Sequence, residues 1–244
     1  FDRAATKTAR TLGPFDCITA PCTDACAVEQ RVPEYMRLVR LGDLEAAAAI
    51  TRADNPLASI LGRACHHPCE RVCLRTHMDR PLAIREIKRL ITEHEPPPEA
   101  SGRARVAAPP VAVVGAGPCG LAAASFLARA RRKVTVFESR GAAGGMVSGT
   151  IPGYRASSAA VARDLERVAA AGVEIRYGRE IGADLGLEDL RAQGFGPIVL
   201  AIGACRGRRL GLAGEDAAGV HDGLDFLRAA RRGAPPALGP RVGV

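Results

Sequence analysis

The stretch 111–124 constrains the fold of this chain more than any other. Its four apolar residues, 111–114, suit a buried strand, and they run into the pattern Gly115-x-Gly117-x-x-Gly120 and then into an alanine-rich segment with high helix propensity. Such a unit needs its first glycine for the turn, its second where a pyrophosphate touches the backbone, and its third for close helix packing. The pattern predicts a dinucleotide-binding α/β domain of the Rossmann type.

The residues after this helix support the same prediction. Residues 133–138, Lys-Val-Thr-Val-Phe-Glu, form the next expected strand and end in Glu138, 18 residues after Gly120. A carboxylate at this place accepts hydrogen bonds from ribose hydroxyls. The alternative is a glycine-bearing loop in an unrelated α/β domain, which the position of the acid disfavours.

Length and composition limit the remaining possibilities. A chain of 244 residues with 47% apolar content can form one large or two small domains with a real core. No apolar run approaches the roughly 20 residues that span a bilayer, and no signal-peptide pattern opens the chain. We therefore expect a soluble, cytoplasmic protein. Because the chain begins at Phe1 and stops in Arg241-Val-Gly-Val, which resembles the start of a buried strand, we expect a fragment at both ends.

The net charge of +8 would permit a polyanionic partner. The basic residues are scattered, however, only three of them are lysines, and aromatic residues make up just 4% of the chain. Stacking platforms for bases are therefore absent. We predict no nucleic-acid partner.

Six of the eight cysteines fall into two triplets in the first third of the chain. If the second triplet lies on one helix, its positions i, i+4 and i+8 share a face, so its three thiols point in one direction. Disulfides are disfavoured because nothing in the sequence indicates secretion. Zinc fits the spacings loosely, since its usual sites use paired CxxC or Cys/His motifs. Two separated triplets favour iron–sulfur clusters, with zinc or purely structural thiols as alternatives. The triplets are Cys17, Cys22, Cys26 and Cys65, Cys69, Cys73.

These motifs carry a family resemblance that extends over nearly the whole chain. The segments that carry it in this domain are Cys17 to Cys26, Val32-Pro-Glu-Tyr, Asn55-Pro-Leu, Gly62 to Cys73 and Pro81 to Lys88. They resemble the N-terminal domain of the glutamate synthase small-subunit family, which is shared with the N-terminal part of dihydropyrimidine dehydrogenase. The version that begins Phe15-Asp-Cys-Ile is closest to the branch assigned to selenate reductases.

The resemblance implies two [4Fe–4S] clusters with interleaved ligands. Cys17, Cys22 and Cys73 would hold one cluster, and Cys26, Cys65 and Cys69 the other. Six cysteines leave two of eight ligand positions open, because Pro14 and Lys88 stand where the family has a cysteine and a glutamine or glutamate. A protonated lysine cannot be a ligand. Nearby substitutes, for which a solvated or capping role is favoured, are Asp16, His66, His67 and Glu86.

A helix over 81–94 is expected to close a helical domain of residues 1–94, followed by a proline-rich linker at 95–109. Four arginines surround the second triplet and could raise the potential of an anionic cluster, although arginine is common throughout the chain. They are Arg63, Arg71, Arg75 and Arg80. The apolar residues expected to face the core from the helix are Leu82, Ile84, Ile87, Leu90 and Ile91.

The second domain, 110–237, resembles the flavin domain of the same family. A glycine-rich loop follows Glu138, then a helix over 157–171 and strands at 173–177 and 197–203. The fold class is thus an α-helical iron–sulfur domain followed by an incomplete α/β Rossmann-like FAD-binding domain. The residues implied to hold FAD are Gly115, Ala116, Gly117, Pro118, Cys119, Gly120, Glu138, Gly144, Gly145, Met146, Arg155, Ile181, Ala201 and Gly203.

The remaining candidates receive simpler interpretations. Cys119 and Cys205 are expected to be structural, and His221 and Asp222 to cap the last helix.

The family inserts a second dinucleotide-binding domain for NAD(P)H, and residues 238–244 are expected to begin it. The preferred function is an electron-transfer module of an NAD(P)H-linked oxidoreductase, passing electrons between nicotinamide, FAD, iron–sulfur clusters and a partner subunit, with no catalytic side chain. The alternative is a zinc-stabilised adaptor with a vestigial nucleotide-binding domain.

Overall fold

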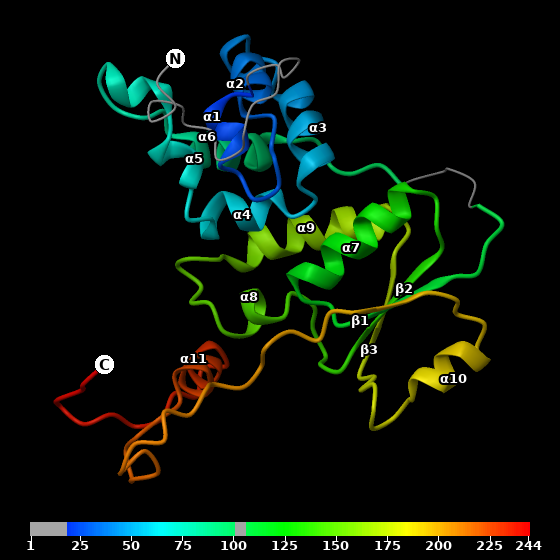
Figure 1. The fold of residues 1–244 in the computed structure, drawn as a ribbon, viewed down its shortest axis with the longest axis vertical. Coiled ribbons are helices and arrows are strands. Elements are labelled where there is room, and N and C mark those ends of the chain that lie inside the picture. The colour runs from blue at the N-terminus through cyan, green and yellow to red at the C-terminus, as the bar shows by residue number, and fades with distance from the viewer. Residues whose placement is uncertain (1–18, 101–105) are drawn as a thin grey trace, which may run out of the picture. The chain divides into compact units, whose positions relative to one another are not determined.

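The computed structural model describes residues 19–100 and 106–244, which belong to two compact units (Figure 1). The first unit ends at Glu99 and the second begins at Ala100. The described part of the first unit contains helices but no strand, whereas the second contains a parallel sheet. This arrangement confirms the expected class, a helical domain followed by a Rossmann-like α/β domain.

Short helices separated by turns form the first unit. Gly42, with a φ of 81°, turns the chain after α2, and the Asp43 carboxylate then caps α3 by accepting a hydrogen bond from the Ala46 N–H at 2.9 Å. The described helices are α1 (Pro21–Asp24), α2 (Val32–Arg40), α3 (Leu44–Asp54), α4 (Ala58–Ala64), α5 (Pro68–Arg71), the 3-10 helix η2 (Leu74–His77) and α6 (Ile84–His94).

The core of this unit brings α2, α3 and α6 together around one of the cysteines. Tyr35, Ala47, Ile84 and Ile91 are buried in it with Cys69. Each buried isoleucine contributes on the order of 1.5–3 kcal/mol relative to an exposed one. The core therefore ties the cysteine segment to the helices, so that packing and thiol position depend on each other.

The last helix of the unit begins three residues later than its pattern predicts. Pro81, Leu82 and Ala83 precede α6, and its first helical residue is Ile84. Ile84 and Ile91 are buried as expected, but Leu82 and Leu90 are 40% and 38% exposed. The prediction that these two leucines face the core is wrong. Leu82 lies outside the helix, and Leu90 lies about a third of a turn away from the line that joins Ile84 to Ile91.

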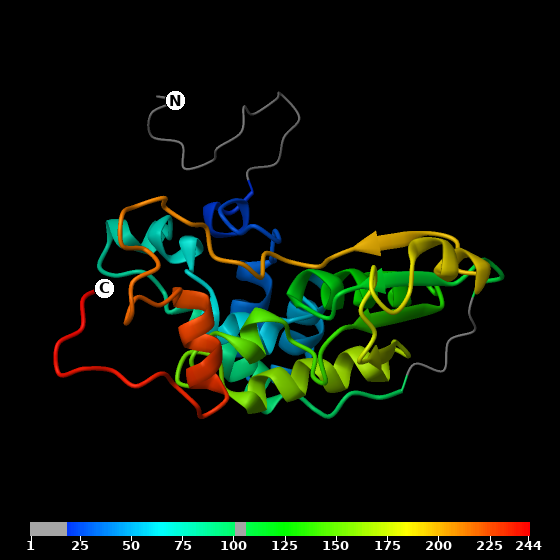
Figure 2. The same cartoon turned by 90° about the horizontal axis from the view of Figure 1, so that it is seen from below.

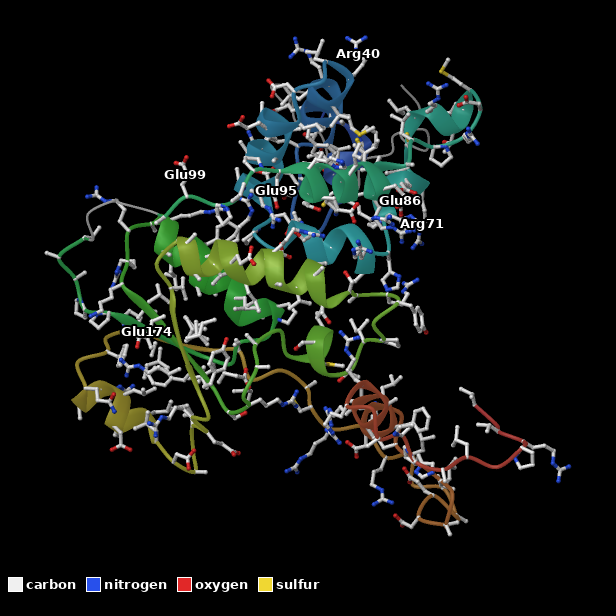
Figure 3. All side chains as sticks on the ribbon, turned by 180° about the vertical axis from the view of Figure 1, so that it is seen from behind. Arg40, Arg71, Glu86, Glu95, Glu99 and Glu174 are labelled. Atoms are coloured by element: carbon white, nitrogen blue, oxygen red, sulfur yellow. The ribbon has the colours of Figure 1, made fainter. Side chains whose placement is uncertain are left out.

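Glu95, which the proline pattern assigns to the linker, is anchored in the first unit. Its carboxylate accepts hydrogen bonds from Arg52 Nε at 3.0 Å and Arg52 Nη2 at 2.5 Å, and the two side chains are 2% and 7% exposed. Arg52 also donates to the Pro56 carbonyl at 2.8 Å. Glu99, four residues farther along, is exposed and projects away from the chain (Figure 3). The anchored part of the chain therefore extends beyond the end of α6.

The second unit is built on a four-stranded parallel sheet with strand order β3-β2-β1-β4. Val113 at its centre is opposite Val136 on one side and Val199 on the other, and Val136 is opposite Ile175. The strands are β1 (Val111–Val114), β2 (Val134–Glu138), β3 (Glu174–Tyr177) and β4 (Ile198–Leu200). The sequence pattern predicts all four strands, although β4 is shorter than the predicted strand at 197–203.

Both faces of β1 are covered, which explains its unbroken apolar sequence. Val113 lies toward α7, where its Cγ1 is 3.3 Å from the place of a Cβ on Gly120, whereas Ala112 and Val114 pack with Leu190 of α10. Helix α7 packs on β1 and β2, and α9 packs against α7 (Figures 1 and 2). The helices of this unit are α7 (Pro118–Arg129), α8 (Met146–Gly149), α9 (Ser158–Ala170), α10 (Leu187–Ala192) and α11 (Gly223–Arg231).

The end of the chain differs from its sequence prediction. Residues 239–244 are exposed and form no strand, so the expected opening strand of another domain is not present within the described residues. A strand needs a neighbour to accept its backbone hydrogen bonds, and no described strand pairs with this segment. None of the described helices combines the length and the apolarity needed to cross a bilayer.

Candidate cluster cavity and dinucleotide site

Three cysteines from three separate segments line one cavity in the first unit. Cys26 lies in the turn after α1, Cys65 directly follows α4, and Cys69 lies in α5. The cavity has a volume of about 140 Å³, and Tyr35 and Ile84 form part of its wall. The structure thus brings together the three cysteines that the resemblance assigns to one cluster.

The second triplet does not occupy one helix face, so that prediction is wrong. Cys65 has extended backbone angles, with φ −65° and ψ 140°, and His67 adopts a left-handed conformation with φ 43°. Pro68 then starts the short α5, since proline disfavours a helical conformation in the residue before it and suits a first helical turn. The thiols converge through turns. The backbone N–H of His67 donates to Cys65 Sγ at 3.2 Å, a contact suited to a thiolate.

The structure describes two of the other three cysteines of the triplets. Cys22 is half-buried in α1, and Cys73 is buried between α5 and η2. Cys73 and Cys26 lie close enough to Cys22 for their charges to act on its thiol. Cys17, the third residue assigned to this cluster, lies outside the described residues, as do Pro14, which stands where the family has a cysteine, and the substitute Asp16.

Burial controls the protonation of these thiols. Burial raises the pKa of Cys69 to about 11, and the positive charge of Lys88 opposes that rise. Burial also raises the pKa of Cys22 and of the Tyr35 hydroxyl, which has four cysteines around it. The metal-free thiols at Cys69 and Cys22 are therefore neutral at pH 7, and a bound metal would displace their protons.

Polar groups that the sequence motifs do not mark complete the cavity. Gln30, Arg85 and Lys88 line it, and Gln30 and Lys88 are 2% and 6% exposed. Lys88 Nζ donates to Gln30 Oε1 at 3.3 Å, and the Arg85 guanidinium donates to the Cys65 carbonyl at 3.3 Å. Gln30 stands in no cysteine motif, and only its buried position reveals it.

Two of the four arginines expected around the second triplet pair with carboxylates. Arg63 pairs with Glu93 and Arg75 with Asp79, and none of the four arginines lines the cavity. Glu86, one of the substitute ligands, pairs with Arg85 and Arg89. His67 does line the cavity, and its Nδ1 lies 3.1 Å from Glu70 Oε2. Arg85 and Lys88 bring positive charge to the cavity itself, and Arg75 is close enough to Cys73 for their charges to interact.

Within residues 19–100 and 106–244, no three His, Cys, Asp or Glu side chains converge tightly enough to hold a single metal ion. A tetrahedral zinc site needs its sulfur ligands about 2.3 Å from one point. Cys26, Cys65 and Cys69 surround a cavity instead, which fits a larger inorganic core held by thiolates on several sides. Three cysteines line the cavity.

In the second unit, the fingerprint glycines lie at the carboxyl end of β1, between β2 and β4. The strand order changes direction here, which is where open α/β sheets bind ligands. Gly115 has a φ of 104°, and a Cβ on it would lie 2.4 Å from the Ala201 carbonyl oxygen. A Cβ on Gly120 would lie 1.9 Å from the Gly115 carbonyl oxygen. Both positions therefore require glycine for packing.

Gly117 differs from the other two fingerprint glycines because the space beside it is open. A Cβ there would meet only the Gly145 Cα, at 3.9 Å, so a side chain would fill space in front of α7 without clashing. Gly117 precedes α7, and no described side chain caps that helix. Its exposed N–H groups and positive dipole end suit a phosphate. The residues present thus fit the pyrophosphate of a dinucleotide.

The glycine-rich loop after β2 folds back onto the fingerprint. The Gly144 N–H donates to the Ala116 carbonyl at 2.8 Å, and a Cβ on Gly145 would lie 2.8 Å from the Gly117 Cα. Close contact between the two loops therefore gives Gly145 a reason to be glycine. The segment ends at Met146, which opens α8.

Glu138 is buried at the end of β2, and both of its carboxylate oxygens face backbone donors. Oε2 accepts from the Ala116 N–H at 2.8 Å, and Oε1 accepts from the Arg140 N–H at 2.9 Å. Oε1 also accepts from the Ser139 hydroxyl at 3.4 Å, whereas Oε2 has a lone pair left for a further hydrogen bond. Glu138 therefore fixes the fingerprint loop and keeps acceptor capacity for a ribose.

The other candidates occupy varied positions. Ile181 packs with the core of Phe137, Leu190 and Phe195, while Arg155 and Gly203 are exposed. Cys119, next to Pro118 in the first turn of α7, is exposed, as is Cys205, so the interpretation of both as structural thiols is wrong. Asp222 caps α11 as predicted, accepting from the Leu224 N–H at 2.9 Å.

Two protein-family models match the sequence in agreement with this geometry. Residues 2–99 match the family described as dihydropyrimidine dehydrogenase domain II, 4Fe–4S cluster. Residues 113–162 match the NAD(P)-binding Rossmann-like domain. The first match contains the cysteine cavity, and the second contains the fingerprint, Glu138 and the loop that folds back on it.

Curated relatives extend over nearly all of the chain. It is 36% identical to the NADPH-Fe(3+) oxidoreductase subunit beta of Geobacter sulfurreducens, over 93% of this chain and 35% of the relative. It is 35% identical to the NADP(+)-dependent formate dehydrogenase subunit beta of Moorella thermoacetica, over 95% and 36%. It is also 35% identical to the glutamate synthase (NADPH) small chain of Mycobacterium tuberculosis, over 89% and 45%. The chain therefore spans less than half the length of these relatives.

Proposed function

We propose that this chain, a homologue of the glutamate synthase small chain and of the beta subunits of two NADP(H)-linked oxidoreductases, is an electron-transfer module. It would pass electrons between a nicotinamide, FAD, iron–sulfur clusters and a partner subunit or domain. The observation that carries the proposal is the placement of Cys26, Cys65 and Cys69 around one cavity, in a chain that also carries a complete dinucleotide fingerprint.

The first unit would hold the clusters through its thiols. We assign Cys26, Cys65 and Cys69 to one [4Fe–4S] cluster and Cys17, Cys22 and Cys73 to a second. Burial of Cys69 and Cys73 keeps water from the sulfurs, and the N–H of His67 stabilises negative charge on Cys65 Sγ. Hydrogen bonds to sulfur and exclusion of solvent both set the potential of such a centre.

The second unit would hold FAD at the carboxyl end of β1. Gly117 leaves room for the pyrophosphate at the start of α7, and Glu138 would accept hydrogen bonds from a ribose. The loop at Gly144 and Gly145 follows β2 directly, where a plain nicotinamide site would begin another helix. We therefore assign the site to FAD, and we place the NAD(P)H site outside the residues of this chain.

Positioning is the task of the protein in this proposal. A flavin exchanges two electrons with a nicotinamide and single electrons with iron–sulfur clusters, so it links the two kinds of carrier. The described site residues provide thiols, backbone donors and one buried carboxylate, and the proposal needs no side chain to act as acid, base or nucleophile. Reduced thiols are usual in the cytoplasm, where we place the protein.

Anaerobic reconstitution with iron and sulfide tests this function against the zinc-stabilised adaptor. The wild-type chain should gain broad visible absorption and, after reduction, a paramagnetic resonance signal from iron–sulfur clusters. The double change Cys65→Ser and Cys69→Ser should remove the part due to one cluster, whereas Cys205→Ser, at an exposed cysteine of the second unit, should change nothing. Colourless protein that retains stoichiometric zinc would favour the adaptor.

A further inference from the structure

Lys88 is a buried cation whose counter-charge is missing from the described protein. Its side chain lines the cavity of Cys26, Cys65 and Cys69, and the residue is 6% exposed. An ammonium group has three donors. Among the described residues, Gln30 Oε1 at 3.3 Å is its one hydrogen-bond partner, and no carboxylate pairs with it.

Gln30 is neutral and cannot supply the missing charge, and its side-chain amide already forms hydrogen bonds with two other residues. Its Oε1 also accepts from Asn55 Nδ2 at 3.5 Å, and its Nε2 donates to the Thr51 carbonyl at 3.4 Å. This neutral network orients the amide oxygen toward Lys88. An isolated buried charge is costly unless it is paired, so the ammonium needs an anion in the cavity it lines.

A cluster held by the three cysteines provides that anion. Three thiolates around a [4Fe–4S]²⁺ core give the assembly a net negative charge, and loss of one Fe²⁺ makes the remainder more negative, even after its oxidation by one electron. Lys88 lines the same cavity as the three cysteines, so its ammonium lies near their sulfurs. Lys88 therefore suits the place beside the cluster as a charge partner, while a protonated amine has no lone pair for iron.

We propose that this cavity binds its cluster through Cys26, Cys65 and Cys69 alone, with the Lys88 ammonium as counter-charge instead of a fourth protein ligand. This inference rests on the proposed function and adds to it one exchangeable iron. Ferricyanide should take one electron as one Fe²⁺ leaves the [4Fe–4S]²⁺ core, which yields ferrocyanide and a [3Fe–4S]⁺ core on the same three thiolates. Reductant and ferrous iron should reverse the change.

The test uses the full chain, reconstituted anaerobically and treated with ferricyanide, and measures the three-iron paramagnetic signal and the iron released. The wild type should give the signal and lose it when ferrous iron and dithionite are added. Lys88→Glu offers a carboxylate ligand and should lower the signal from this site roughly tenfold, the lower end of what one supporting group contributes at a metal site. Lys88→Gln should lower it in the same direction and guards against misfolding of the first variant.

Matched controls isolate the effect. Arg89→Gln removes a cation at the next position of α6, where Arg89 pairs with Glu86 and Glu93 outside the cavity, and it should behave as the wild type. Each chain is also prepared with Cys22→Ser, which removes a ligand proposed for the other cluster only, so that the remaining signal comes from the cavity. Circular dichroism checks that every variant is folded.

The outcomes separate the two proposals. Equal three-iron signals in the wild type and in both Lys88 variants would overturn the inference and leave the cluster assignment intact. So would a wild type that keeps all its iron under ferricyanide while Gln30→Leu or His67→Asn loses it, because a protein ligand would then be present. Failure of every chain to take up iron would overturn the proposed function, and the inference with it.

Discussion

The carboxylate of Glu138 accepts a hydrogen bond from the backbone N–H of Ala116 at 2.8 Å, across 22 residues of sequence. This bond joins the end of β2 to the turn that follows β1. It places the acid of the second strand against the loop that would carry a pyrophosphate. The same carboxylate therefore links the stability of the domain to its binding site.

Replacing Glu138 should lower both the stability of the domain and its affinity for FAD. Glu138→Ala leaves the Ala116 N–H without its acceptor, and we expect a loss of about 1–3 kcal/mol in the free energy of unfolding, measured by urea denaturation. FAD binding, followed by flavin fluorescence, should weaken as well. The exposed pair of Glu174 and Arg176 offers a control, since Glu174→Gln should change stability by no more than about 0.5 kcal/mol. Unchanged flavin affinity in Glu138→Ala would contradict the assigned role.

Gly120 should tolerate no side chain. The Cβ of Gly120→Ala would lie 1.9 Å from the Gly115 carbonyl oxygen, so α7 must move away from the sheet. We expect a destabilisation of roughly 1–3 kcal/mol and loss of flavin binding. Gly141→Ala is the matched change in the same unit, because the residue is exposed and a Cβ on it would meet nothing within 4 Å. Equal stability of the two variants would show that the close approach is not required.

The buried pair of Arg52 and Glu95 should be costly to break. Glu95→Gln leaves the arginine buried without its counter-charge, and we expect the first unit to lose about 3–5 kcal/mol of stability. Arg75→Ala, at an exposed pair with Asp79, should cost at most about 1 kcal/mol. Thermal and urea unfolding followed by circular dichroism compares them. Similar midpoints for both variants would place Glu95 in the linker, as the proline pattern suggests.

Alkylation should distinguish the cysteines of the metal-free chain. The exposed Cys119 and Cys205 should react first with iodoacetamide at pH 8. Cys69 should react slowly, because the thiolate is the nucleophile and burial raises the pKa of this thiol to about 11. Its rate should therefore rise as the pH increases toward 11, and mass spectrometry of peptides measures it. Rapid labelling of Cys69 at pH 8 would mean that the cavity wall opens in the metal-free chain.

The local sequence pattern was sufficient to predict the order of strands and helices around the site of the second unit. The glycine spacing, the apolar run before it and the position of Glu138 are all set by neighbouring residues, and they predict the order of strands and helices around the site. The end of the chain is different. Residues 239–244 have the composition of a strand, but a strand also needs a pairing partner, and the described sheet offers them none.

The sequence motifs mark the three cysteines that line the cavity, but they do not predict how the backbone brings these cysteines together. Spacing alone suggests that Cys65, Cys69 and Cys73 share a helix face, whereas the left-handed His67 and Pro68 break the helix between them. Gln30 and the Arg85 guanidinium reach the cavity through tertiary packing, which no local pattern marks. Lys88 was visible in the sequence only as a mismatched ligand, and its burial beside Gln30 gives it a role.

Elemental and cofactor analysis of the intact chain, purified anaerobically without added metal, tests the central claim most directly. The account predicts iron and acid-labile sulfide in similar amounts, together with FAD released on denaturation and no stoichiometric zinc. Protein that contains zinc but neither iron nor flavin would contradict it.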